Sequence, residues 1–285
     1  MDLATAVTIS GECETASRWI RERCAVIFDR EQCEFSSGVW IGIGDHVFVA
    51  TAGHAIPASP NRRLWLMRKD GSFEHQGFPS FLKYGKIETS ELDVGFLELS
   101  RETFGAYFGQ QPLVRVDQIE NAGIGRKSRL HGIVGCPVVD VKQVTNVENV
   151  DGRPAFVNNF RVSVITLQCT PLSDEDWPTH WIGGYQPNQG HDLVFEYPKG
   201  NETVDPRFEL KPAELPSPKG MSGGGIWDYG LRHEEIWSPN DCRLVGLQHS
   251  RDPDQDLIRG TQIRHWLNLI VEHYPMLKDE VLHLL

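Results

Sequence analysis

The chain has 285 residues, of which 40% are hydrophobic and 24% are charged, and its formal net charge is −11. A chain of this length and apolar content can bury a sizeable core in one large domain or two smaller units, which excludes a disordered or fibrous protein. The surplus of carboxylates argues against binding to a phosphate backbone, because that attraction needs clustered lysine and arginine. We therefore expect a globular protein that does not bind nucleic acid.

Targeting and membrane signals are not seen in this sequence. No run of about eighteen apolar residues occurs, and the first residues show no basic segment followed by an apolar one. These patterns predict a soluble, cytoplasmic protein without a membrane partner.

The six cysteines show no Cys-x-x-Cys pair and no histidine at zinc-site spacing, so we expect buried thiols and no metal. Disulfides would not persist in a reducing compartment. The sequence also contains neither a dinucleotide-binding glycine fingerprint nor a phosphate-binding loop. Chemistry without a cofactor is therefore predicted.

The first part of the chain changes from helical to extended character. The stretch TASRWIRER is compatible with a helix, and the apolar run CAVIF that follows is typical of a first strand. Residues 36–50, SSGVWIGIGDHVFVA, contain two short apolar runs separated by Gly44-Asp45. This pattern indicates a β-hairpin.

Further strand-like runs follow between clusters of glycine, proline, asparagine and aspartate: LWLMR, DVGFLEL, SRLHGIVGC, FRVSVITLQC, DLVFEY, GGGIWDY and RLVGLQH. Many short strands broken by turns predict an all-β barrel or sandwich. Helical periodicity with one apolar face is clear only over 261–274. Residues 171–220 are expected to form long loops, and their stretch from Trp177 to Tyr185 fits either a partner-docking surface or a plain solvated loop.

The pentapeptide Gly220-Met221-Ser222-Gly223-Gly224 lies just before the strand-like run GIWDY. Glycines beside a serine allow a tight turn whose N–H groups converge on one point, as a nucleophile needs when an oxyanion develops. A serine among glycines is also common in ordinary loops. The rest of the sequence decides between these interpretations.

A histidine and an aspartate complete the candidate set. His54 follows the strand-like run HVFVA in the turn Thr51-Ala52-Gly53-His54, where it could act as a general base or be only a hydrogen-bonded structural histidine. Asp93 opens the apolar run DVGFLEL. A charge there needs a partner such as His54, or else the aspartate simply caps the strand.

Together these three segments resemble the catalytic blocks of trypsin-like (chymotrypsin-fold) serine proteases, in the family's order of histidine, aspartate and serine. The resemblance extends from about Cys24 to the C-terminal helix. It implies an all-β fold of two six-stranded antiparallel β-barrels with a C-terminal α-helix. The boundaries that it implies are an N-terminal extension (1–22), a first barrel carrying His54 and Asp93 (23–118), a second barrel carrying Ser222 (119–262) and the C-terminal helix (263–285).

By this resemblance His54, Asp93 and Ser222 form a catalytic triad, and the backbone N–H groups of Gly220 and Ser222 form an oxyanion hole. The chain is then a serine endopeptidase that hydrolyses a polypeptide substrate through an acyl-enzyme. An alternative stays open: a latent or non-catalytic domain of this fold that binds peptides, or a regulated effector that needs an activating protein partner or ligand. The intact triad residues count against the non-catalytic form.

Two positions depart from the family pattern. Secreted digestive members carry an aspartate before the nucleophile, which pairs with a new amino terminus after zymogen cleavage, whereas this chain has Met221. That activation route is not expected. Ala55 follows His54 where those members have a cysteine, which fits an intracellular relative without disulfides.

The resemblance also indicates a substrate pocket. Pro216 stands where trypsin has the aspartate that binds lysine or arginine, so cleavage after basic residues is not expected. The strand-like run LVGLQHS predicts that Gln248, His249 and Ser250 approach the pocket, and that peptide binds by strand addition from His249 to Arg251. His249 fits two interpretations: a pocket residue favouring an acidic or amide side chain, or a buried histidine bonded near Asp93.

Overall fold

The computed structural model describes residues 3–67, 81–109, 111–120, 130–138, 142–150, 153–182, 185–197, 217–231 and 237–285. Its strands are β1 (Cys24–Asp29), β2 (Glu34–Ile43), β3 (His46–Thr51), β4 (Leu64–Leu66), β5 (Lys83–Glu88), β6 (Asp93–Leu99), β7 (His131–Gly135), β8 (Lys142–Val150), β9 (Arg153–Arg161), β10 (Ile165–Cys169), β11 (Asp192–Glu196), β12 (Gly225–Asp228), β13 (Arg243–Asp252) and β14 (Leu257–Gln262). Its α-helices are α1 (Leu3–Arg21), α2 (Pro60–Arg63), α3 (Arg101–Phe108), α4 (Ile263–His273) and α5 (Lys278–Val281).

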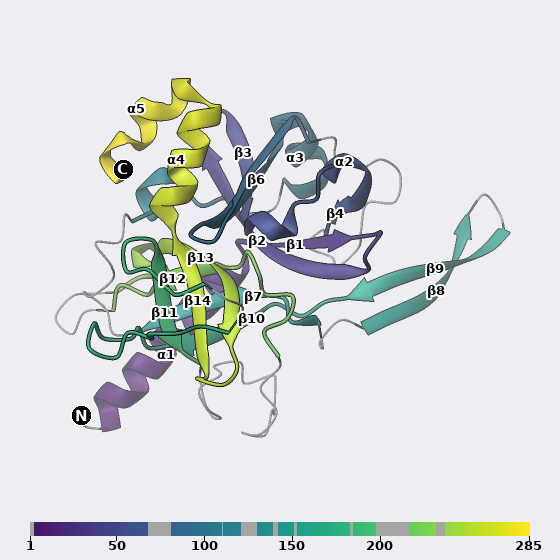
Figure 1. Ribbon diagram of the computed structural model, residues 1–285. Helices are drawn as coiled ribbons and strands as arrows, with labels where there is room; N and C mark the ends of the chain where they lie inside the picture. The colour runs from purple at the N-terminus through teal and green to yellow at the C-terminus, as the bar shows by residue number, and fades with distance from the viewer. Residues whose placement is uncertain are drawn as a thin grey trace.

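The strands form two six-stranded antiparallel sheets, in the orders β4-β1-β2-β3-β6-β5 and β10-β7-β12-β13-β14-β11 (Figure 1). This confirms the predicted fold class. The second sheet curls far enough to meet itself, because a bridge between Pro171 and Phe195 joins the end of β10 to β11. In the first sheet, the described ladder runs from β4 to β5 without such a bridge.

The predicted hairpin is also confirmed. β2 and β3 pair from Val39 opposite Ala50 to Ile43 opposite His46, which leaves Gly44-Asp45 as a two-residue turn. Most side chains of both strands are buried, because β2 and β3 lie in the middle of the first sheet with the second sheet behind them.

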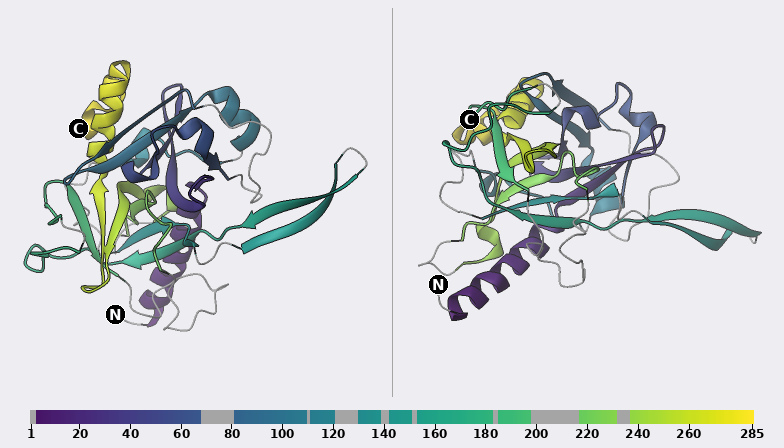
Figure 2. Two further views of the ribbon diagram at one scale, coloured as in Figure 1. Left: turned by 45° about the vertical axis from the view of Figure 1, so that its right-hand side comes forward. Right: turned by 60° about the horizontal axis from the view of Figure 1, so that its bottom comes forward.

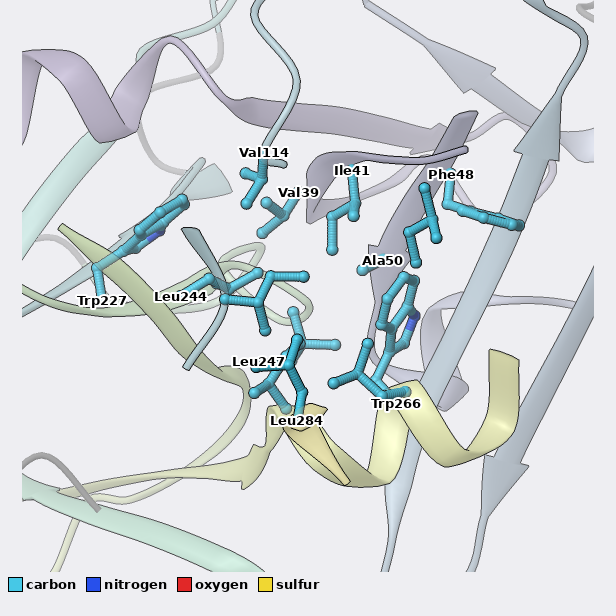
Figure 3. Close-up of a cluster of buried hydrophobic side chains, with 14 of the residues drawn as sticks. Val39, Ile41, Phe48, Ala50, Val114, Trp227, Leu244, Leu247, Trp266 and Leu284 are labelled. Atoms are coloured by element: carbon cyan, nitrogen blue, oxygen red, sulfur yellow. The ribbon is translucent and has the colours of Figure 1, made fainter. Parts of the chain in front are cut away.

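One hydrophobic cluster joins the two sheets. Figure 3 shows side chains from β2 and β3 of the first sheet meeting side chains from β12 and β13 of the second sheet and from α4. The labelled members are Val39, Ile41, Phe48, Ala50, Val114, Trp227, Leu244, Leu247, Trp266 and Leu284. Each fully buried large apolar side chain stabilises the fold by about 1.5–3 kcal/mol, so the interface between the sheets is a genuine core.

The N-terminal extension is a helix that docks on the second sheet. Over residues 11–21, the part of α1 whose side chains the structure describes, the buried positions are Cys13, Ala16, Ser17 and Ile20, a spacing that places them on one helical face. The hydroxyls of Ser17 and Tyr229 lie 3.0 Å apart in this contact. Helix α1 therefore packs against the half of the molecule that lies later in the chain, near β7 and β10 (Figure 2).

The C-terminal segment is not one continuous helix. Helix α4 ends at His273, and two 3₁₀ turns and the short α5 follow. The indole N–H of Trp266 donates to the carbonyl of Gly95 in β6 at 3.1 Å, and the Tyr274 hydroxyl donates to the buried Glu98 carboxylate at 2.6 Å. The C-terminal segment thus leaves the second sheet and is fastened to the first.

Strands β8 and β9 form a separate two-stranded ribbon, paired from Lys142 opposite Arg161 to Val150 opposite Arg153. It extends away from both sheets in every view (Figures 1 and 2).

All six cysteines are free thiols; Cys33 is exposed and the others are buried. Among the described helices, none is both long and apolar enough to cross a membrane.

Candidate active site

Strand register brings His54 and Asp93 together. Strand β3 pairs with β6 as far as Thr51 opposite Gly95. The chain beyond Thr51 therefore runs beside the residues that precede Gly95, and the 3₁₀ turn Gly53–Ala55 places His54 against the first residue of β6. The antiparallel pairing of β3 with β6 and the short turn after β3 are therefore enough to bring His54 against Asp93.

The two residues are joined by two hydrogen bonds, one between their side chains and one from the His54 backbone. The Nδ1 atom of His54 lies 2.6 Å from Oδ2 of Asp93, and the His54 backbone N–H donates to Oδ1 at 3.0 Å. An ionised carboxylate is only an acceptor, so Nδ1 carries the proton and Nε2 is left with its lone pair. The His54 side chain is 40% exposed and that of Asp93 is 17% exposed, which leaves the free ring nitrogen accessible.

Each partner shifts the pKa of the other. Burial raises the pKa of the Asp93 carboxyl, but the hydrogen bond and charge of His54, with the charge of His249, outweigh burial and hold the pKa below its ordinary value. Burial lowers the pKa of His54, but the hydrogen bond and charge of Asp93, with the charge of Glu88, outweigh it and raise that pKa. Glu88 acts at short range because it lies opposite Asp93 in the β5–β6 ladder.

Ser222 lies in a loop of the second sheet, beside His249, whose ring is 4.0 Å from the Asp93 carboxylate. Strands β12 and β13 pair from Gly225 opposite Leu247, so the residues before Gly225 lie beside those after Leu247. The Ser222 hydroxyl donates to the backbone carbonyl of His249 at 3.3 Å, and no hydrogen bond joins it to His54 among the residues that the structure describes. Catalytic hydrogen bonds are often long or misaligned before substrate binds.

The loop around Ser222 leaves two backbone N–H groups without an acceptor in the described part of the chain. The carbonyl of Lys219 accepts from the Val138 N–H, and the carbonyl of Met221 accepts from the Gly224 N–H, both at 2.8 Å. In a planar trans peptide the N–H points away from the carbonyl. The N–H groups of Gly220 and Ser222 therefore point away from these anchors, and neither has an acceptor in the described part of the chain.

Two glycines of this loop have no simple replacement. Gly220 and Gly223 have φ angles of +94° and +88°, a region that side-chain-bearing residues rarely adopt. A Cβ on Gly220 would lie 2.6 Å from the Cys136 carbonyl oxygen. The glycines predicted to be needed for a tight turn are thus needed for backbone angle and for space.

His249 lies between two carboxylates. It is at an irregularity in the pairing of β13 with β14, between Gln248 and Ser250, and its side chain is only 9% exposed. Its Nδ1 is 4.0 Å from Asp93 Oδ2, and its Nε2 is 3.9 Å from Oδ1 of Asp192. These positions agree with the interpretation of a buried histidine near Asp93.

A cavity of about 290 Å³ opens beside His54. Its lining comes from His54, the turn at 88–93, the aromatic stretch at Trp181, Ile182 and Tyr185, and His249, Ser250 and Arg259. The Arg259 guanidinium is neutralised by the buried Asp192 at 2.8 Å. Most of these lining residues are not predicted by the sequence, although the many aromatic residues from Trp177 to Tyr185 are a signal that could have indicated them.

The predicted substrate-binding residues lie in different surroundings. His249 and Ser250 line the cavity. Gln248 is buried and its backbone pairs with the nucleophile loop on both sides, accepting from Gly223 at 2.6 Å and donating to Gly224 at 2.8 Å. Arg251 lies over the ring of Tyr197. Pro216 is outside the described residues.

No group of three or more histidine, cysteine, aspartate or glutamate side chains that could hold a metal ion is found within the described ranges.

Neither protein-family models nor curated proteins match the chain. Among solved structures it is similar to the protease Rv3671c of M. tuberculosis in its active form, with a TM-score of 0.41 and 11% identity over 95% of this chain and 86% of that one. It is also similar to the VesB protease of Vibrio cholerae (0.47, 11%, 92% of this chain and 65% of that one). A third is an inactivated protease paralogue of the scabies mite (0.46, 12%, 90% and 96%). At these TM-scores and identities, the likenesses carry no statement about activity.

Proposed function

We propose that the chain is a serine endopeptidase of the trypsin-like type, with His54, Asp93 and Ser222 as its catalytic triad. The observation that carries this proposal is the 2.6 Å contact between His54 Nδ1 and Asp93 Oδ2, near His249, whose backbone carbonyl accepts from the Ser222 hydroxyl. It leaves His54 Nε2 as a base on the side from which a hydroxyl can be deprotonated.

In the proposed reaction the Ser222 oxygen attacks a peptide carbonyl while His54 Nε2 takes the hydroxyl proton. The N–H groups of Gly220 and Ser222 would stabilise the negative charge on the carbonyl oxygen. His54 then gives its proton to the departing amine as the C–N bond breaks, and a water molecule hydrolyses the resulting ester in the same way. Asp93 holds the histidine tautomer and stabilises the imidazolium.

The substrate is proposed to bind as an added strand along the end of β13. Strand β12 pairs with β13 only as far as Leu247, whereas β13 continues to Asp252 and pairs there with β14. Among the residues that the structure describes, no strand pairs with the other edge of the segment from His249 to Arg251, beside Ser222. Backbone pairing at such an edge gives affinity, and the cavity beside His54 would receive a substrate side chain.

One observation favours the alternative of a latent domain. The Ser222 hydroxyl donates to the His249 carbonyl, so the nucleophile would have to rotate before His54 could deprotonate it. In this version an activating partner or ligand causes the rotation. A cytoplasmic location belongs to the same proposal, and the six free thiols agree with a reducing compartment.

Labelling with a fluorophosphonate probe tests the proposed function. The purified wild-type protein is expected to gain one adduct by intact mass, mapped to the peptide containing Ser222. Ser222→Ala and His54→Ala should remain unlabelled while keeping the wild-type circular dichroism spectrum. A folded wild-type protein without an adduct would favour the latent or non-catalytic alternative.

The labelling rate is expected to rise with pH as His54 loses its proton, because only the neutral imidazole can act as a base. Since the pKa of His54 is raised, the midpoint should lie above the ordinary value of 6.5. Glu88→Gln removes a negative charge that favours the imidazolium, so it should move the midpoint to lower pH. Glu91→Gln is the control, since this neighbouring exposed residue does not contribute to the shift. A midpoint at or below 6.5, or equal shifts in both variants, would contradict this explanation.

A further inference from the structure

We propose that Ser37, a residue of the first sheet, is the positioning residue that holds the oxyanion-binding loop of the second sheet in its productive shape. Ser37 lies in β2 and its side chain is fully buried, at 0% exposure. The inference rests on the proposed function, because the loop in question is the one that carries Ser222.

The Ser37 hydroxyl joins three segments of the chain. It donates to the carbonyl of Gly220 at 2.8 Å and accepts from the N–H of Cys136, also at 2.8 Å. Donor and acceptor capacity are therefore both used inside the protein. The backbone contributes as well, since the Ser37 N–H donates to the Ser222 carbonyl at 2.8 Å.

These bonds matter because Gly220 is a point at which the loop can easily rotate. A glycine with positive φ can turn the peptides on either side of it with little steric resistance. The peptide before Gly220 is held by Val138, whose N–H binds the Lys219 carbonyl. The peptide after Gly220 is held by the Ser37 hydroxyl through the Gly220 carbonyl. With both peptides held, the Gly220 N–H keeps its direction toward the site.

The backbone carbonyl of Ser37 is also bonded, to the end of β3. Thr51, three residues before the proposed general base, donates its hydroxyl to the Ser37 carbonyl at 2.7 Å. The same short segment of β2 therefore fixes the end of β3, which leads to His54, and the loop of Ser222. Ser37 therefore fixes the position of the Ser222 loop relative to the end of β3, which leads to His54.

The test compares Ser37→Ala with wild type in fluorophosphonate labelling over a range of probe concentrations. This separates the limiting rate constant, kinact, from the probe affinity, KI. Ser37→Ala should lower kinact about 10- to 100-fold and leave KI unchanged. This is less than the effect of removing an oxyanion-hole N–H donor outright, because the Gly220 N–H is still present in the variant. The labelled fraction reports how much protein is folded, while kinact reports the competence of folded molecules.

Ser17→Ala is the matched control, because Ser17 is another fully buried serine whose hydroxyl is bonded in the core, to Tyr229. It should lower the melting temperature and keep the wild-type kinact. Equal kinact values for Ser37→Ala and wild type, or the same decrease in both serine variants, would overturn the inference. If Ser37→Ala yields no folded protein, Ser37→Thr is measured instead. This variant retains the hydroxyl and should keep kinact within about threefold of wild type. A decrease of about tenfold in Ser37→Thr would also overturn the inference. Failure of the proposed function is recognised separately, since wild type itself would then not label.

Discussion

Asp93→Asn is expected to lower the limiting rate of peptide hydrolysis about 10⁴-fold, with little change in substrate affinity. The carboxylate accepts from both His54 Nδ1 and the His54 backbone N–H. An amide can face Nδ1 with its N–H₂ group and stabilise the tautomer that carries its proton on Nε2, which cannot take a proton from Ser222. Shape and packing change little, so the loss should be in kcat and not in KM.

Hydrolysis of an unfolded protein substrate by purified variants measures this effect. Asp117→Asn is the control: Asp117 is exposed, is paired with Arg115 at 2.7 Å, and its pKa is lowered mainly by that bond, but it lies outside the site. It should hydrolyse at the wild-type rate. Should Asp93→Asn retain more than about a tenth of wild-type kcat, the assignment of Asp93 as the residue that orients His54 would be wrong.

Gly223→Ala is expected to reduce hydrolysis about 10³-fold, as for the loss of an oxyanion donor, and to destabilise the fold by about 3 kcal/mol. At a φ of +88° alanine is strained, and its Cβ would overlap the Thr51 hydroxyl and the Ser37 carbonyl. Moving the loop away would break the hydrogen bond from the Gly223 N–H to the Gln248 carbonyl. Ser222 and its N–H would therefore be displaced together.

Urea unfolding and hydrolysis assays on the same sample separate the two effects. Gly105→Ala is the matched control, since Gly105 lies in helix α3 and a Cβ there meets nothing within 4 Å. Alanine favours a helix over glycine by up to about 1 kcal/mol, so this variant should be slightly stabilised and fully active. Normal activity of Gly223→Ala would show that the nucleophile loop tolerates a different backbone.

Local sequence was sufficient for the centre of the fold. The strand before His54, the strand that begins at Asp93 and the strand after Ser222 are apolar runs bounded by turn residues, and each lies where the sequence predicts it. The pairing of His54 with Asp93 follows from a short antiparallel register. Contacts that are set by neighbouring strands can be predicted when the strands themselves have a clear pattern.

The sequence was less informative where a strand is amphipathic or polar. Strand β5, KYGKIE, buries only Gly85 and resembles a loop in composition. Strand β14 ends with Thr261 and Gln262, which the helical periodicity had assigned to the start of the C-terminal helix. In both cases pairing with a neighbouring strand determined the structure, and a single sequence does not reveal such a partner.

Most contacts between distant segments could not be predicted from the sequence, although the position of His249 near Asp93 was one of the two interpretations offered for that residue. Ser37 stands in an ordinary strand sequence, and its bonds to Gly220 and Cys136 depend on how the two sheets meet. The cavity lining is likewise drawn from segments far apart in the chain, at Glu88, Trp181 and Arg259. Such sites arise from packing, which local pattern does not encode.

The two ends of the chain cross over between the halves of the molecule. Helix α1 precedes the first sheet but packs on the second, and α4 follows the second sheet but is bonded to Gly95 in the first. Hinge motion of one half against the other would have to break both attachments. The distance between the two halves is therefore expected to be nearly constant, so any control of Ser222 is expected to act by rotating side chains or loops while the two sheets stay in place. A small molecule or partner that binds only to the outer surfaces of the two halves is therefore expected to have little effect on the rate of the proposed reaction.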